Sequence, residues 1–232
     1  MTARLELMPS GPSSRRTLAE VAAADLHELI LSGELPPGTP LRLVDLAKRL
    51  QMSQMPVREG LRRLEALGLV DVVPHRGAWV RELSMDDLLD THKTRLALET
   101  LAVREAAARF TEADAARAAE ALAEQQRLIK AGDHVGARSA HTDFHFAIYR
   151  AGGSRWLPRS IEPVWQNSER YRFGAPRNKA KIEQARLEHQ AILDACVARD
   201  VDGAEAALRA HLEGVMRRIT ESMIARGVKG SQ

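Results

Sequence analysis

The sequence predicts a mainly α protein with two domains, an N-terminal winged helix-turn-helix and a C-terminal antiparallel all-α bundle of about six helices. Three observations predict this fold class. Residues 41–80 follow the order short helix, tight turn, Arg-rich helix and hairpin, and no alternating strand pattern follows residue 82. Of the 232 residues, 44% are hydrophobic and only 4% aromatic, with abundant Ala and Leu. We expect residues 1–16 to be a mobile tail, 17–82 the winged domain and 83–228 the bundle.

Capping signals predict the helices of the first domain. Thr17 and Glu20 have the spacing of a capping box, which starts a helix that runs to about residue 31. A second short helix, over 44–50, carries an apolar stripe. Its members are Leu43, Leu46, Ala47 and Leu50. We expect Ser53 to cap a third helix by accepting from its free N–H groups, and Gly68 to end that helix.

The third helix and the hairpin after it carry positive charge. The inward stripe of the helix is Val57, Leu61, Leu64 and Leu67, and its outward arginines are Arg58, Arg62 and Arg63. Strands are expected over 69–73 and 78–80, joined by a turn in which Gly77 supplies a positive φ. Between Lys48 and Arg81 there are seven Lys or Arg against three acids, so this segment holds most of the formal net charge of +3. Such a local basic face is typical of DNA binding, although arginines on a helix are by themselves more often a solvated face.

These segments together resemble the winged helix of the GntR family of bacterial transcription regulators. The resemblance covers residues 17–82 and depends on GELPPGTPL, PVREGLRRLEALGLV and HRGAWV, which occur in the family's order and spacing. It implies that the third helix enters the major groove and that the hairpin tip touches the minor groove. By position, it implies that Arg58, Arg76 and Gly77 contact DNA.

The N-terminal end of the third helix departs from the family pattern. Gln54 and Met55 stand where the family usually has Arg and Thr. Because Arg favours the edge of guanine and Gln that of adenine, this departure leaves the operator sequence open. The expected DNA-binding residues are Ser53, Gln54, Met55, Arg58, Arg62, His75, Arg76 and Gly77.

Composition also predicts where the protein acts. The single cysteine, Cys196, excludes an internal disulfide and fits a reducing cytoplasm. No stretch is apolar for long enough to span a bilayer, and the first sixteen residues lack the apolar core of a secretory signal. We therefore expect a cytoplasmic, nucleoid-associated protein with no membrane partner.

Helix start and stop signals predict the second domain. Ser84 and Asp87 have the spacing of a helix start. Six helical segments are expected, at about 85–109, 112–131, 134–151, 155–173, 178–199 and 202–226. Such helices bury their apolar stripes only as an antiparallel bundle with short connections. Pro158 and Pro163 should kink or delay the fourth segment and leave room inside the bundle.

Four histidines carry the chemistry of this bundle. His141 and His145 lie one helical turn apart, and His189 and His211 each share a helix face with small apolar residues, so all four are expected to point inward. Imidazoles brought together inside a bundle lose stability if all are protonated, whereas a divalent cation makes them a favourable ligand set. Each histidine taken alone is more often a hydrogen-bonded core residue, but four on three apolar faces favour a metal.

The bundle sequence resembles the FCD effector domain of the FadR branch of GntR regulators. The resemblance spans about residues 85–220 and depends on FH at 144–145, EHQAI at 188–192 and AEAALRAHL at 204–212. It implies a Zn, Ni or Mn site made by one Asp and three His, which holds a carboxylate effector. Carried over by position, it implies His145, His189 and His211 as ligands.

The family's Asp is replaced by His141 in this chain. Asp143 lies about 200° of helical rotation from His145 and therefore cannot take its place. Either His141 is a fourth ligand, which we favour, or three histidines hold the metal together with water. A set of imidazoles favours Zn, Ni or Cu over Mn or Ca, so the expected cofactor is a divalent metal, with Zn or Ni favoured.

Arg95 and Tyr149 are the expected effector-binding residues. Arg95 matches a family position that can face the effector cavity, where a guanidinium would hold a carboxylate by two parallel hydrogen bonds. The alternative for Arg95 is an internal ion pair with Glu99, one turn away. Arg170 and Arg172 are further candidates for lining the cavity, with surface placement as the alternative.

The function expected from these observations is that of a ligand-responsive regulator, not an enzyme. The expected form is a homodimer on a near-palindromic double-stranded DNA operator. The resemblance implies that repression relieved by a small organic acid is the commonest behaviour, with activation as the alternative, and we expect the acid to act through the junction at 81–84. Two alternatives stay open. One is a metal-dependent hydrolase with a winged-helix docking module, since three His and an open position also describe catalytic zinc, although no Glu is placed as an obvious general base. The other is a regulator that senses the metal itself.

Overall fold

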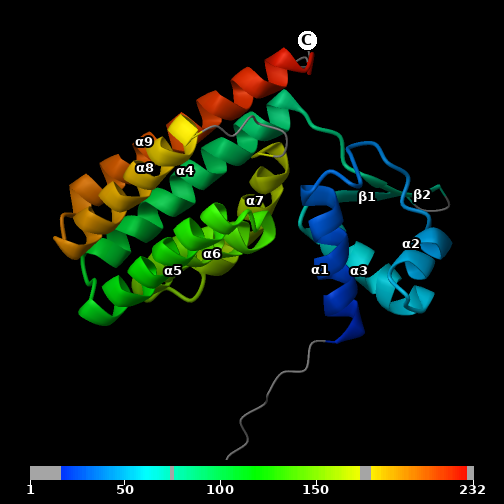
Figure 1. Cartoon of the computed structure of the whole chain (residues 1–232), viewed down its shortest axis with the longest axis horizontal. Coiled ribbons are helices and arrows are strands. Elements are labelled where there is room, and N and C mark those ends of the chain that lie inside the picture. The colour runs from blue at the N-terminus through cyan, green and yellow to red at the C-terminus, as the bar shows by residue number, and fades with distance from the viewer. Residues whose placement is uncertain (1–16, 74–75, 173–178, 229–232) are drawn as a thin grey trace, which may run out of the picture.

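The computed structural model describes residues 17–73, 76–172 and 179–228, which form two helical units joined near residue 82 (Figure 1). The N-terminal unit contains α1 (Leu18–Leu31), α2 (Leu43–Arg49), α3 (Gln54–Ala66), β1 (Val70–Val73) and β2 (Gly77–Val80). The bundle contains α4 (Met85–Ala107), α5 (Glu112–Ala131), α6 (His134–Ala151), α7 (Leu157–Arg172), α8 (Lys179–Val197) and α9 (Val201–Ala225). The mainly α class that the sequence predicts is confirmed. The predicted tail at 1–16 and the predicted DNA contact at His75 lie outside the described residues.

The N-terminal unit has a core of its own between α1 and α3. α1 starts with the predicted capping box, in which Thr17 Oγ1 accepts from the Glu20 N–H at 3.2 Å and Glu20 Oε2 accepts from the Thr17 N–H at 2.8 Å. Where the two helices cross, a Cβ on Gly60 would lie 3.0 Å from the backbone nitrogen of Ala23. A larger residue at this position would press on the backbone of α1, so the close approach of α1 and α3 favours glycine here.

The start of α3 differs from the prediction at Ser53. Its backbone is extended, with φ −71° and ψ 162°, as an N-cap requires, but its side chain makes no capping bond within the described residues. An N-cap side chain accepts from the second or third N–H of the helix, and Pro56 occupies the third position, where it has no N–H. The end of α3 follows the prediction, because Gly68 adopts φ +72°.

The hairpin pairs β1 with β2 in antiparallel register, from Val70 opposite Val80 to Val73 opposite Gly77. Gly77 has φ +113°, as the turn requires. The segment before α2 adds to the other edge of β2, since the Leu41 N–H donates to the carbonyl of Ala78 at 2.8 Å. The hairpin is thereby fixed to the helical core.

The bundle contains the six predicted helices, joined by short connections. α5 packs on α6, α9 lies against α4 and α8, and α7 packs on α4. The largest fully buried side chains of this core include Phe144, Tyr149, Ile161 and Trp165. α7 starts at Leu157 with Pro158 in its first turn, and Pro163 lies inside it. In the part of the chain that the structure describes, no helix is long and apolar enough to cross a membrane.

The junction between the two units is held by α7. The Arg170 guanidinium donates to the backbone carbonyls of Arg81 and Glu82, both at 3.0 Å, and to Asp87 Oδ2 at 2.7 Å. Arg170 is 4% exposed. The sequence left open whether Arg170 lines the cavity or lies on the surface. It does neither, because its side chain is buried at the junction.

Candidate metal centre and nucleic-acid interface

Four buried histidines from three helices meet inside the bundle. His141 and His145 come from α6, His189 from α8 and His211 from α9, and none is more than 5% exposed. One ring nitrogen of each lies within 4.8 Å of those of all the others. The predicted meeting of these side chains is therefore present in the structure, and we refer to them below as the histidine cluster.

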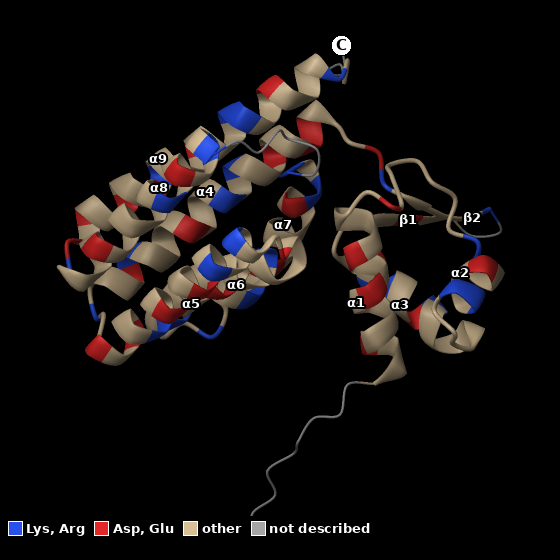
Figure 2. Cartoon of the chain, viewed as in Figure 1, with Lys and Arg blue, Asp and Glu red and all other residues tan. Residues whose placement is uncertain are grey.

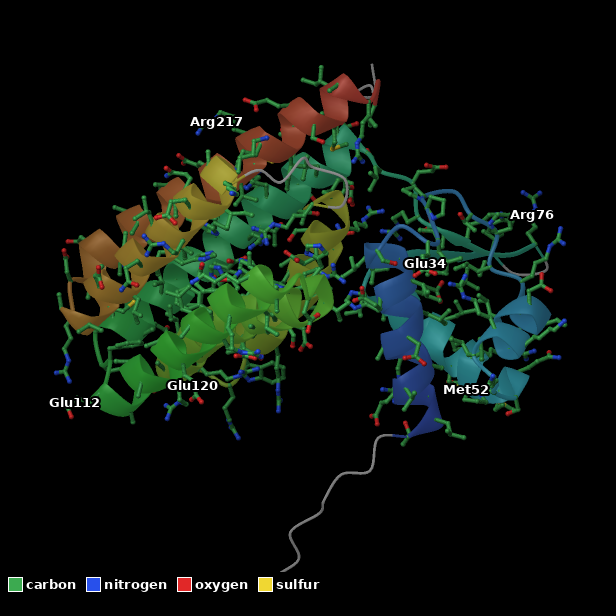
Figure 3. The ribbon with its side chains drawn as sticks, in the orientation of Figure 1. Glu34, Met52, Arg76, Glu112, Glu120 and Arg217 are labelled. Carbon is green, nitrogen blue, oxygen red and sulfur yellow. The ribbon has the colours of Figure 1, made fainter. Side chains whose placement is uncertain are left out.

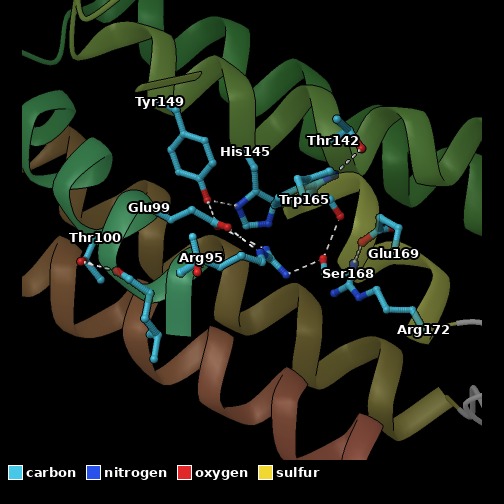
Figure 4. A network of polar contacts seen from close by, with 12 residues as sticks. Arg95, Glu99, Thr100, Thr142, His145, Tyr149, Trp165, Ser168, Glu169 and Arg172 are labelled. Carbon is cyan, nitrogen blue, oxygen red and sulfur yellow. Dashed lines mark hydrogen bonds and ion pairs between the residues drawn. The ribbon is translucent and has the colours of Figure 1, made fainter. Parts of the chain in front are cut away.

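Partners on the outer side of the cluster determine which ring nitrogen of two histidines carries the proton. His211 Nδ1 lies 2.8 Å from Glu188 Oε2, and because a carboxylate only accepts, the proton is on Nδ1. The Tyr149 hydroxyl donates to Glu99 Oε2 at 2.6 Å and therefore accepts from His145 Nδ1 at 3.2 Å (Figure 4). In both rings Nε2 keeps its lone pair, which is the form and the outer support that metal-ligating histidines have.

The inner side of the cluster is incompletely satisfied by protein groups alone. His145 Nε2 and His189 Nε2 lie 3.3 Å apart. If His189 donates across this gap, its Nδ1 is left as an acceptor, and that buried atom has no hydrogen-bond partner among the described residues. A cation between the rings would instead use the lone pairs that face one another. The residues present therefore fit a divalent metal.

Electrostatics keep the cluster neutral. Burial is the main cause that holds the pKa of His141, His145 and His189 well below the ordinary value of 6.5, and neighbouring cationic groups add to it. The pKa of His211 is also lowered, chiefly by burial, against the opposing effect of Glu188. Neutral imidazole is the form that binds a metal ion.

His141 differs from the other three histidines because a guanidinium lies against its ring. Arg172 Nη1 is 3.3 Å from His141 Nδ1 and 3.4 Å from His141 Nε2. The same nitrogen donates to Glu169 Oε1 at 2.9 Å (Figure 4). Ligation by His141 therefore needs Arg172 to move away from the ring. His145 and His211 present Nε2 to the cluster without such a change.

Arg95 forms the internal ion pair with Glu99, so its guanidinium is not free to bind an effector carboxylate. Its Nε and Nη2 donate to the two carboxylate oxygens of Glu99 at 2.5 and 3.2 Å, and its Nη1 donates to Ser168 at 2.9 Å (Figure 4). The guanidinium also lies 4.7 Å from the centre of the Trp165 ring. Arg95 and Tyr149 are both buried and engaged in this network, so their geometry favours a supporting role behind the cluster over direct contact with an effector.

A cavity of about 300 Å³ adjoins the cluster and reaches His141 and His189. Its described lining includes one acidic residue, Glu169, and five basic ones. The basic residues are Arg138, Arg172, Lys181, Arg186 and Arg218. Its size is within the range of small-molecule sites, and its charge suits an anion.

Among these basic residues only Arg172 was predicted from the sequence. Two of the others had a detectable signal. Arg138 precedes His141 by three residues and Arg218 follows His211 by seven, and both spacings place a residue on the same helix face as the histidine.

The predicted DNA-contacting side chains lie at the exposed end of α3 and on the hairpin. Gln54, Met55 and Arg58 are all exposed, and Met55 is 67% exposed. In the described structure Arg58 has no acidic partner, whereas Arg62 is paired with Glu59 at 3.2 Å.

The hairpin points away from the bundle, and Arg76 extends outward from it (Figure 3). In this domain the Lys and Arg lie on α2, on α3 and on the hairpin, whereas α1, which faces the bundle, carries acidic residues and no Lys or Arg (Figure 2). The helix next to the bundle is therefore acidic.

Comparison with known proteins gives the same two parts. Residues 18–80 match the bacterial regulatory proteins of the gntR family, and residues 90–214 match the FCD domain. The "Probable D-xylose utilization operon transcriptional repressor" of Paenarthrobacter nicotinovorans is 32% identical over 206 residues, which cover 86% of this chain and 89% of that protein. The HTH-type transcriptional repressor RspR of Escherichia coli K12 is 25% identical over 221 residues, 95% of each chain. The solved structure of E. coli McbR/YncC superposes with a TM-score of 0.78 at 26% identity and covers 89% of this chain and 98% of that one.

Proposed function

The chain belongs to the GntR family of bacterial regulatory proteins and carries an FCD domain, and from this premise we propose that it is a repressor released by a small organic acid bound at a divalent metal. This family consists of DNA-binding transcription regulators and not of enzymes, which excludes the alternative of a metal-dependent hydrolase. The observation that carries the proposal is the buried histidine cluster beside a cavity with five basic lining residues.

The metal would be held by His145, His189 and His211, with His141 as the fourth ligand once Arg172 has moved. A set made of imidazoles alone supports Zn or Ni over Mn or Ca. When bound, the metal would supply a Lewis-acid position at which a carboxylate can be coordinated. The outer contacts of His145 with Tyr149 and of His211 with Glu188 would keep the ligand rings in place.

The effector would occupy the cavity next to the cluster. A carboxylate fits the charge of a lining that has five basic residues and one acidic one. Arg172 comes from α7 and lies between His141 and Glu169, so it is placed to exchange one partner for an incoming anion.

The DNA-binding unit would act as half of a homodimer. A single winged helix contacts only a short half-site, and a two-fold dimer on a near-palindromic operator doubles the contact. Arg58 and Arg76 are exposed for phosphate or base contact, and Gln54 and Met55 would determine base preference. The names of two relatives, both repressors, support repression as the sign of regulation.

Elemental analysis of the purified protein tests the metal site. We expect bound Zn or Ni in the wild type and its loss in a His145→Ala/His189→Ala double variant. A His92→Ala variant is the control, because this half-buried histidine on α4 lies outside the cluster. Unchanged metal content in the double variant would exclude these two histidines as the main ligands.

The role of the acid is tested by retention of genomic DNA fragments on the purified protein. Metal-loaded and metal-free protein are compared at one salt concentration, with and without small carboxylates, since such binding depends strongly on salt. Release only when metal and acid are both present supports the proposal. Release by the metal alone would instead identify a metal sensor.

A further inference from the structure

We propose that the effector is a diacid whose second acidic group takes Arg138 away from Glu28, which frees α1 of the DNA-binding unit from the bundle. This inference rests on the proposed effector site and adds both the charge of the ligand and the contact through which binding is transmitted. The inference depends on Arg138, which lines the cavity and also forms an ion pair between the two units.

The ion pair joins α6 of the bundle to α1 of the DNA-binding unit. Arg138 Nη2 bonds to Glu28 Oε1, and the two side chains are 20% and 33% exposed. Arg138 precedes His141 by three residues, so its side chain lies on the same helix face as the histidine cluster. An anion that occupies the cavity next to His141 therefore comes within reach of the arginine that Glu28 holds.

The surroundings of this ion pair are polar. His27 lies beside Glu28 on α1, and its Nε2 is buried without a hydrogen-bond partner among the described residues. The charges of Glu28, Glu169 and Arg138 all act on His27. Glu169 accepts from Arg172, which lies on His141, so the residues that face α1 are the same ones that border the cavity. A polar contact of this kind between units is one that a competing ligand can open.

The pairing of the other cavity cations explains why a second acidic group is needed. Three of the other four cavity cations are paired within the bundle, Arg172 with Glu169, Arg186 with Glu183 and Arg218 with Glu188. Arg138 has its partner in the other unit. A monoacid coordinated at the metal leaves the Arg138–Glu28 pair intact, because its single carboxylate is already used. A diacid presents its second carboxylate to Arg138, where a charge-assisted bond inside the cavity competes with a partly exposed pair.

Calorimetric titration of metal-loaded full-length protein tests this competition. The probes are the linear diacids from malonate to adipate, each with the monoacid of the same chain length, and the variant is Glu28→Gln. Because the neutral amide of this variant competes only weakly for Arg138, the best diacid should bind about two- to fivefold more tightly than to the wild type, and its monoacid should bind as before. Glu34→Gln is the matched control, since it breaks an exposed Arg–Glu pair that lies within the DNA-binding unit.

Arg138→Met gives the reverse test, because it keeps most of the side-chain stem and removes the charge. Diacid affinity should then fall to that of the matching monoacid. A thermal unfolding curve close to that of the wild type shows that the variant is folded. The inference is overturned if Glu28→Gln leaves diacid affinity unchanged, or if it changes diacid and monoacid affinities alike.

Amide hydrogen exchange of α1 separates this inference from the proposed function. Residues 18–31 should exchange faster in the wild type when the diacid is added, and in Glu28→Gln already without it. If monoacids and diacids bind equally and neither responds to Glu28→Gln, the effector site stands and this inference fails. If the metal-free His145→Ala/His189→Ala variant binds the diacid with the same response to Glu28→Gln, the inference stands and the metal proposal fails. Absence of binding by any acid contradicts both.

Discussion

Replacing Tyr149 with Phe removes one oxygen atom from the outer side of the histidine cluster and leaves every proposed metal ligand in place. In the structure that oxygen lies 2.6 Å from Glu99 Oε2 and 3.2 Å from His145 Nδ1. The substitution leaves the His145 Nδ1–H without its acceptor, so the ring loses the contact that fixes its orientation. Loss of such an outer partner lowers metal affinity about 10- to 100-fold, or about 1.4–2.8 kcal/mol.

The assay is competition for Zn²⁺ against a chromophoric chelator, with Tyr171→Phe as the matched control. Tyr171 is also buried and its hydroxyl also bonds to a carboxylate, but its described contacts are with Asp87, Arg170 and Ser84 and not with a histidine. Each variant should lose about 1.5–3 kcal/mol of stability in the metal-free state, because each loses a hydrogen bond to a charged group. Only Tyr149→Phe should lose metal affinity. Wild-type zinc affinity in Tyr149→Phe would refute the reasoning.

Three further changes have defined outcomes. Arg58→Ala should weaken DNA retention and reduce the slope of log affinity against log salt by about one, as expected for one lost phosphate contact. Arg95→Met should destabilise the protein by about 3–5 kcal/mol, because the buried Glu99 carboxylate loses its cationic partner. In urea denaturation, Arg95→Met/Glu99→Leu should recover most of that loss. Asp87→Asn should make the free energy of unfolding fall less steeply with pH below about pH 4 than it does in the wild type.

The sign of the Asp87 effect follows from its surroundings. Burial raises the pKa of this carboxyl, but the bonds from Tyr171, Asn167 and Arg170 outweigh burial and hold the pKa below its ordinary value of 3.8. A group with a lowered pKa in the folded state stabilises above its unfolded pKa, and that stability is lost as the pH falls through the folded value. Asn does not titrate, so urea midpoints of the variant should change less than those of the wild type between pH 5 and pH 3. Identical pH profiles would exclude Asp87 as a source of the acid sensitivity.

Controls for the other two changes come from the same chain. Arg127→Ala removes an exposed, paired arginine on α5 and should leave DNA retention and its salt slope unchanged. An Arg58→Ala protein that binds DNA like the wild type would argue against α3 as the inserted helix. For the buried pair, a double variant as unstable as the sum of its single variants would mean that Arg95 and Glu99 are not energetically coupled.

The starts and ends of helices were predictable from the sequence because each depends on only a few neighbouring residues. The capping box at Thr17, the helix start at Ser84 and the left-handed end at Gly68 formed as spacing predicts. The cap expected from Ser53 is not formed, and Pro56 removes one of the two N–H groups that it could satisfy. The meeting of the histidines was predictable for a related reason, since helix periodicity places each one on an inward face.

What the sequence left open depends on contacts between distant helices. Whether Arg95 faces an effector or Glu99 is decided by Ser168 and Trp165, which reach it from α7. The partner of Arg138 is 110 residues away on α1. Neither choice follows from periodicity, because the rotation of one helix against another is fixed only when the core packs.

The most direct test of the account is acid-induced release of a genomic DNA fragment, measured at fixed salt for the zinc-loaded wild type and for His145→Ala/His189→Ala. The acid is the diacid that binds most tightly in calorimetry. We predict that both proteins retain the fragment without acid and that the acid releases it from the wild type alone. Equal release from both proteins, or no release from either, would contradict the claim that DNA binding is controlled through the histidine cluster.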